Sequence, residues 1–212
     1  KSVNTNELAE ALEVAPASVT GMLKKLSKDG YLDYTPRQGA GLTSKGLQVA
    51  LEVIRHHRLL EAFFVQRLGM DWTQAHREAE ILEHFISEEL EQLIDTAMGH
   101  PQEDPHGAPI PQLDGSIAER EFVCLADVAR PGNLVIRRVR AESAELLDYL
   151  RQMNLVPGNS FELVAVAPFD GPLSLRVDGR ELHIGRTVAH ALYVEPPEDA
   201  ASAAPENSNG TK

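Results

Sequence analysis

The feature that most constrains this chain is a helix-like stretch, residues 73–98, that carries two histidines and several glutamates. Its apolar residues recur at i, i+4, i+8 and i+11, as they do along one side of an α-helix: Leu82, Ile86, Leu90 and Leu93. At 100° per residue, four possible ligands fall on one face beside this stripe: His76, Glu80, Glu83 and His84. Imidazoles and carboxylates on one face predict a site for a divalent metal ion. The alternative is a solvated acidic face with incidental histidines, since glutamate is common on exposed helices.

The charge of the 212-residue chain, −12 in total, is unevenly distributed. Residues 1–46 carry six basic and five acidic side chains, whereas residues 47–118 carry four basic and thirteen acidic ones. The same middle segment holds six of the eight histidines. It should therefore attract cations, and the overall negative charge does not exclude a DNA-binding segment at the N-terminus.

Cysteine and hydropathy patterns indicate a cytoplasmic chain without a membrane partner. Cys124 is the single cysteine, which excludes a disulfide framework and a zinc site built from several thiolates. No apolar run approaches the roughly 20 residues that span a bilayer, and no signal peptide is visible. The chain begins at Lys1 rather than Met, so we expect its native start to be missing.

Residues 1–46 predict a winged helix-turn-helix domain. Asn4 and Glu7 can cap a helix over residues 4–12, and Pro16 suits the first turn of a second helix that ends near Gly30. A hairpin with a basic, glycine-rich tip follows. In this motif the second helix enters the major groove, which predicts DNA contacts from Ser18, Thr20, Lys24, Lys25 and Lys28, with Arg37 and Gln38 at the wing tip. The alternative is a solvated lysine-bearing helix on another small α/β unit.

Residues 47–112 predict a helical domain. A long helix that starts after Thr43 carries His57 and Glu61 at i and i+4, a second possible ligand pair. His56, one step round this helix, is expected on the surface. The proline-rich stretch at residues 100–111 predicts an ordered loop or linker without regular structure.

In residues 119–196 the hydrophobic period changes to two. Five short apolar runs separated by Pro-Gly and Asp-Gly pairs, with one helix at residues 143–153, predict an SH3-like β-barrel. Residues 197–212 lack apolar anchors and are expected to form a disordered tail. The predicted fold class is therefore α+β, with a winged helix, a helical domain and a small barrel in that order.

Three motifs resemble those of the diphtheria toxin repressor family, which includes the manganese transport regulators. They are His57-Arg-Leu-Leu-Glu61, His76-x3-Glu80-x2-Glu83-His84 and Pro105-His-Gly-x-Pro-Ile-Pro111. The barrel resembles the FeoA domain, particularly near Pro157-Gly158 and Ala167-Pro-Phe169. The resemblance implies a homodimeric, Mn²⁺- or Fe²⁺-dependent regulator that binds double-stranded operator DNA and represses metal-uptake genes, with no enzymatic activity. It also implies a helix before Val3 that supplies a further metal ligand.

The resemblance assigns two metal sites. Glu80, Glu83 and His84 match the primary, activating site, and His57, Glu61 and His76 match the ancillary site. Glu142 and Glu145 fit two further ancillary ligands from the barrel, but the alignment also allows Ala141 at the first position. Their alternative role is that of surface carboxylates at a helix start, where the helix dipole favours negative charge. Iron-type members have cysteine at the position of Glu80, so its carboxylate favours Mn²⁺, although Zn²⁺, Co²⁺ or Cd²⁺ can substitute in vitro.

Two other classes of function remain alternatives at this point. A His/Glu site could serve a non-haem metalloenzyme, but no nucleophile or substrate pocket is recognisable beside it. A metal-buffering accessory protein would use the barrel, whose His183 and His190 lack ligand spacing. Gly21 stands in the predicted recognition helix where relatives often have a longer polar side chain, which leaves the operator sequence open.

Overall fold

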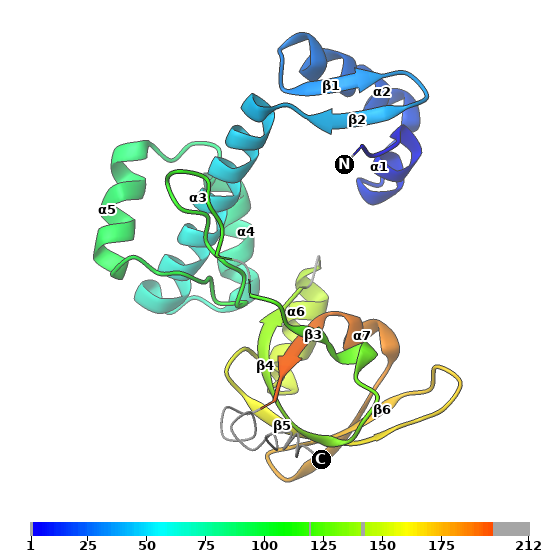
Figure 1. Cartoon of the computed structure of the whole chain (residues 1–212). Helices are drawn as coiled ribbons and strands as arrows, with labels where there is room; N and C mark the ends of the chain where they lie inside the picture. Colours follow the sequence, from blue (N-terminus) through cyan, green and yellow to red (C-terminus); the bar gives the residue numbers. More distant parts are fainter. Residues whose placement is uncertain (1, 119, 141–142, 197–212) are drawn as a thin grey trace, which may run out of the picture. The chain divides into compact units, whose positions relative to one another are not determined.

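A computed structural model describes residues 2–118, 120–140 and 143–196 of the chain (Figure 1). The predicted ligand Glu142, the alternative Ala141 and the predicted tail lie outside the described residues. The chain divides into two compact units, residues 1–55 with 111–116, and residues 56–110 with 117–212. Each unit is considered by itself below. In the described part of the chain, no helix combines the length and apolarity needed to cross a bilayer.

The N-terminal unit contains the predicted winged helix. Helix α1 (Thr5–Ala11) begins with a capping box in which the Asn4 side chain accepts from the amides of Asn6 and Glu7, while Glu7 accepts from the Asn4 amide. Helix α2 (Pro16–Lys28) has proline in its first turn and buries Val19 and Leu23. Strands β1 (Leu32–Thr35) and β2 (Gly39–Leu42) pair antiparallel to form the wing.

One side of this winged helix is an open apolar groove of about 900 Å³. It is lined by side chains of α1, α2, the wing and the start of α3, among them the exposed Leu12, Met22 and Leu47. The buried core of this domain is small, Ala9, Val19, Leu23 and Ala40, and the last three of these also line the groove.

Helix α3 (Ser44–Leu68) begins at the base of the wing. The Thr43 hydroxyl donates to the Gly30 carbonyl at 2.8 Å and accepts from the Gly46 amide at 3.1 Å, so it caps the helix and ties it to the preceding turn. The helix continues past the boundary between the two units and carries His57 and Glu61 in its second half.

The predicted single helix over residues 73–98 is wrong, because the segment forms two helices, α4 (Trp72–Leu82) and α5 (Glu88–Met98). Ser87 caps α5, its hydroxyl accepting from the Leu90 amide at 3.3 Å, and acidic side chains fill the first turn of that helix. These start signals end the helical period after Leu82. Only His76 and Glu80 therefore share a helical face; Glu83 is the C-terminal cap of α4 and His84 lies beyond it.

The predicted apolar stripe is also less buried than its period indicated. Leu82, Leu90 and Leu93 are 41, 49 and 61% exposed, and Phe85 between the helices is 80% exposed. The helical core is formed by other residues of α3, α4 and α5: Leu59, Leu60, Phe64, Ala75, Ala79 and Ile94.

The C-terminal SH3-like domain is a six-stranded antiparallel sheet in the order β3-β8-β4-β5-β6-β7. Five strands match predicted runs: β3 (Val123–Cys124), β4 (Gly132–Val139), β5 (Ser160–Val166), β6 (Leu173–Val177) and β8 (Leu192–Glu195). Helix α6 (Ala144–Gln152) matches the predicted helix. The sequence patterns did not predict strand β7 (Arg180–Ile184), which begins with the charged pair Arg180-Glu181, nor the short elements η1 (Leu125–Asp127) and α7 (Arg186–His190). The predicted α+β fold class is confirmed.

Replacing Gly46 by alanine tests the contact between α3 and the wing. An added Cβ would lie 2.0 Å from the Tyr31 carbonyl oxygen, so backbone must shift, and we expect a loss of about 1–3 kcal/mol in unfolding free energy. The matched control is Gly21→Ala in α2, where a Cβ meets nothing within 4 Å and should stabilise by about 0.5–1 kcal/mol. Chemical denaturation of both variants measures the difference. Equal stabilities would contradict the close packing at Gly46.

Candidate metal centre

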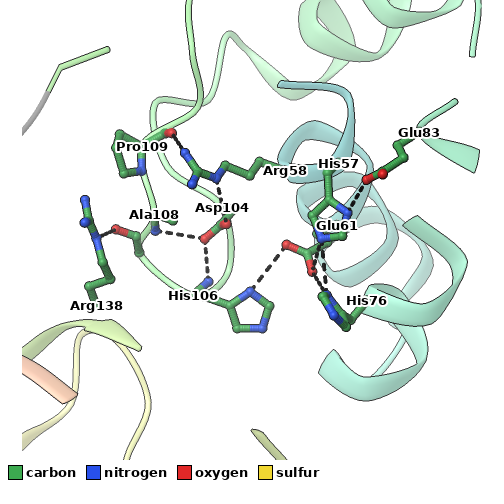
Figure 2. A network of polar contacts seen from close by, with 11 residues as sticks. His57, Arg58, Glu61, His76, Glu83, Asp104, His106, Ala108, Pro109 and Arg138 are labelled. Atoms are coloured by element: carbon green, nitrogen blue, oxygen red, sulfur yellow. Dashed lines mark hydrogen bonds and ion pairs between the residues drawn. The ribbon is translucent and has the colours of Figure 1, made fainter. Parts of the chain in front are cut away.

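Three possible ligands from α3 and α4 converge on one point (Figure 2). His57 and Glu61 lie one turn apart on α3, so both side chains leave the same face of the helix. The Glu61 Oε1 atom is 3.1 Å from His57 Nε2 and 2.8 Å from His76 Nδ1, and those two nitrogens are 3.2 Å apart. We call His57, Glu61 and His76 the helix triad.

The spacing of the helix triad fits a divalent metal ion. Neighbouring ligands bound at about 2.0–2.2 Å lie about 3 Å from each other around one ion, which is the spacing of these three atoms. The same spacing also serves hydrogen bonds and ion pairs among the three side chains. His57, Glu61 and His76 would therefore hold a divalent ion with little movement of α3 and α4.

A second group of possible ligands shares Glu61, and its other two members were not predicted from the sequence. The loop before Ile110 brings Asp104 and His106 to its other side, and His106 Nδ1 is 3.4 Å from Glu61 Oε2 (Figure 2). Asp104 Oδ1 accepts from the amides of His106 and Ala108 at 2.8 and 2.9 Å, which turns the loop back on itself. We call Glu61, Asp104 and His106 the loop triad. Its only sequence signal was the family motif that begins at Pro105, directly after Asp104, because ligands in a loop follow no period.

The loop triad contains a polar atom without a partner. His106 is 8% exposed, and its Nε2 atom is buried with no hydrogen bond among the described residues. The ring lies edge-on to Trp72, with centroids 4.8 Å apart. An unpartnered buried nitrogen is costly in a purely structural role, and the ring's other nitrogen, Nδ1, faces Glu61 in a ligand position.

Both triads border one cavity of about 190 Å³. Besides the five ligand residues, its lining comes from α3, the loop, β4 and α6: Arg58, Ala108, Val139, Arg140 and Leu147. The donor atoms that face it are imidazole nitrogens and carboxylate oxygens. Cys124, the single cysteine, lies in β3 and is not part of this lining.

The residues predicted for the primary site do not form one group. Among the described residues, the sets of three close ligand atoms include neither Glu80 nor Glu83 nor His84. Glu83 instead pairs with His57, Oε2 to Nδ1 at 2.6 Å, and with His84 at 3.3 Å. Glu80 lies 3.6 Å from His76 Nε2 and is largely exposed. Glu145 is exposed in the first turn of α6 and does not line the cavity.

The electrostatics of the site depend on the buried Glu61. Burial would raise the pKa of Glu61, but hydrogen bonds from His106, His57 and His76 hold the pKa of this carboxyl far below its usual range. Burial would lower the pKa of His57, but Glu61 and Glu83 outweigh it and raise the pKa to about 9. Burial raises the pKa of Asp104, and Glu61 raises that of His106 despite the burial of the ring. The imidazole of His57 is therefore protonated on both nitrogens, and positively charged, at neutral pH.

The predicted DNA-binding residues separate into two groups around α2. Thr20 and Arg37 border a common hollow with Asn4, Asn6 and Pro16, and Arg37 has a φ of 70° at the wing tip. The Thr20 hydroxyl donates to the Pro16 carbonyl at 2.9 Å. Ser18 lines the apolar groove instead. The side chains of Lys24, Lys25, Lys28 and Gln38 are exposed.

A winged helix joined to a helical domain with a His/Glu metal centre defines a metal-responsive DNA-binding regulator. The chain matches the family model for the N-terminal DNA-binding domain of iron-dependent repressors over residues 1–40, and the model for their metal-binding and dimerisation domain over residues 43–112. The FeoA domain model matches residues 123–196. The chain belongs to the iron-dependent repressor family, and the resemblance to the diphtheria toxin repressor is confirmed.

Relatives along most of the chain support this assignment. The iron-dependent repressor IdeR of Mycobacterium leprae is 30% identical over 201 residues, which cover 89% of this chain and 86% of IdeR. The transcriptional regulator MntR of Lysinibacillus sphaericus is 42% identical over 82 residues, 39% of this chain and 58% of MntR. A solved manganese-dependent transcriptional repressor in complex with manganese superposes with a TM-score of 0.82 at 32% identity, covering 92% of this chain and 91% of that one.

These findings decide between the classes of function. The chain is a metal-dependent transcriptional repressor, because its relatives over nearly its whole length are such repressors. The metalloenzyme alternative is dropped on the same ground.

The raised pKa of His57 predicts that metal binding releases a proton. Below pH 9 the ion must displace the proton that His57 holds between Glu61 and Glu83, so the apparent Mn²⁺ affinity should rise about tenfold per pH unit for one displaced proton. Titrations at several pH values between about 6.5 and 8.5 measure the slope. His100→Gln, which removes an exposed histidine paired with Asp95, should leave the slope unchanged. A flat profile in the wild type would contradict this protonation state.

Proposed function

We propose that the chain is a homodimeric repressor that binds Mn²⁺ and then binds operator DNA upstream of metal-uptake genes in the cytoplasm. The proposal rests mainly on the helix triad and the loop triad, which share Glu61. Five side chains from α3, α4 and the loop supply three imidazoles and two carboxylates around one cavity. When bound, the metal supplies positive charge that replaces the histidine protons beside Glu61.

The donor set supports Mn²⁺ as the effector. Carboxylate oxygens are hard ligands that suit Mn²⁺, and no thiolate, which would favour Fe²⁺, Zn²⁺ or Co²⁺, borders the cavity. Fe²⁺ is the second candidate, since relatives include iron-dependent repressors. Zn²⁺ should still bind more tightly than Mn²⁺ by the general affinity order, so affinity alone does not identify the effector.

Exposed apolar side chains on α4, α5 and their connection support a homodimer. Phe85 is 80% exposed, and Ile81, Leu82, Leu90 and Leu93 are between 41 and 61% exposed. Apolar side chains of this size usually become buried against a partner when they gather on one part of a surface. These five residues, which we call the apolar α4–α5 surface, belong to the domain whose family description includes dimerisation. We propose that a second copy covers them.

The test of this function is a Mn²⁺ titration of the full chain with and without operator DNA. Coupling between two ligands is reciprocal, so operator DNA should tighten Mn²⁺ binding by the same factor by which Mn²⁺ tightens operator binding, typically about 5- to 150-fold. Fe²⁺ under anaerobic conditions and Zn²⁺ provide the ranking of effectors. Equal Mn²⁺ affinities with and without DNA would leave the metal with a structural role only.

A pair of variants in α2 tests which face meets DNA. Thr20 borders the hollow beside the wing, and Lys24 follows it by four residues on the same side of the helix. Lys24→Ala should weaken binding to all operator sequences alike and reduce the salt slope by about one ion. Ser18→Ala, at a residue that lines the apolar groove, removes no charge and should leave both the operator affinity and the slope unchanged. Gel shifts across a salt series measure both variants; weaker binding by Ser18→Ala together with wild-type binding by Lys24→Ala would place the DNA on the other face.

A further inference from the structure

Two adjacent histidines of α3 approach the same residue at the end of α4. His57 contacts the carboxylate of Glu83, Nδ1 to Oε2 at 2.6 Å, and His56 Nδ1 lies 3.0 Å from the Glu83 carbonyl oxygen. A carbonyl oxygen only accepts, so His56 Nδ1 carries a proton and donates it. Glu83 is the C-terminal cap of α4, where carbonyls lack partners within the helix. The end of α4 is therefore held on α3 through both its backbone and its side chain.

The other nitrogen of His56 faces α5. Its Nε2 atom is 3.5 Å from Glu91 Oε2, and the two residues are only 6 and 4% exposed. The expectation that His56 lies on the surface is thus wrong, because the helix that starts at Ser87 folds back to cover it. His56 thus contacts the end of α4 through a hydrogen bond to a backbone carbonyl, while its Nε2 faces a buried carboxylate of α5 without a hydrogen bond among the described residues.

Glu91 lies between the two apolar residues that α5 exposes. Glu91 and Ile94 point into the domain, whereas Leu90 and Leu93 are 49 and 61% exposed. Glu91 therefore places the contact with His56 on the helical turn that also carries Leu90 and Leu93. At the other end of the link, a shift of Glu83 moves the carboxylate that contacts His57, a member of the helix triad.

We propose that His56 and Glu91 are positioning residues that couple the metal centre to the apolar α4–α5 surface. Neither residue belongs to a ligand triad; they act by fixing the Glu83 carbonyl and the first turn of α5 relative to α3. This inference rests on the proposed metal-dependent dimer. It predicts that breaking the link leaves Mn²⁺ binding in place but makes dimerisation independent of Mn²⁺.

Three substitutions in the full chain test the link. In His56→Asn the amide nitrogen replaces Nδ1 and keeps the bond to Glu83 but does not reach Glu91. In His56→Gln the amide replaces Nε2 and reaches Glu91 but loses the Glu83 bond. Glu91→Gln keeps the shape of the side chain and removes its charge. Glu89→Gln is the matched control, since Glu89 is an exposed glutamate in the same turn.

The measurement is the dimer dissociation constant by sedimentation equilibrium, with Mn²⁺ and with a chelator. In the wild type and in Glu89→Gln we expect Mn²⁺ to tighten the dimer by about 5- to 150-fold; in the three test variants the ratio should fall to about one. A merely structural role would lower unfolding stability in proportion to each lost contact and leave this ratio unchanged. If the variants keep the wild-type ratio, the proposal is overturned.

Operator binding by the same wild-type protein separates this inference from the proposed function. Mn²⁺-dependent operator binding with a dimerisation constant that does not respond to Mn²⁺ would overturn the coupling and leave the function standing. Absence of Mn²⁺-dependent operator binding would overturn both.

Discussion

The structure of the metal centre depends on one buried carboxylate. Glu61 is 2% exposed, and a carboxylate removed from water costs several kcal/mol unless charge or hydrogen bonds compensate it. Three histidines surround it, His57 and His76 at one oxygen and His106 at the other (Figure 2). Side chains from α3, α4 and the loop before Ile110 therefore meet at this one group.

The C-terminal domain contributes to the centre by holding the loop. The Val139 amide donates to the His106 carbonyl at 2.8 Å, and Arg138 donates to the Gly107 carbonyl at 3.3 Å. Gly107 has a φ of +76°, and a Cβ there would lie 1.9 Å from the Arg137 carbonyl oxygen, so only glycine allows this approach of loop to β4. A strand of the FeoA-like domain thus fixes the loop triad without supplying a described ligand.

Sequence patterns predicted what local rules determine. The capping box at Asn4, the proline at the start of α2 and the i, i+4 pair His57 and Glu61 follow from short-range geometry, and the structure contains all three. The helix period of residues 73–98 failed because the apolar spacing happens to continue across Ser87, where a new cap starts a second helix. Asp104 and His106 were not predicted as ligands because a loop has no period. The burial of His56 could not be predicted from its own helix, because α5, far along the chain, covers it.

Either protonated histidines or a metal ion can compensate the negative charge of Glu61, which suits the centre to regulation. In a structural zinc site the chain unfolds without its metal, because nothing else holds the ligands. Here the proton on His57, held by Glu61 and Glu83, keeps the three ligands of the helix triad about as close as a metal ion requires. A metal ion held by the helix triad would supply positive charge at the same place, beside Glu61. In a metal-bound centre His57 would hold the ion through Nε2, and its Nδ1, which lies 2.6 Å from Glu83 Oε2, would connect the centre to the end of α4.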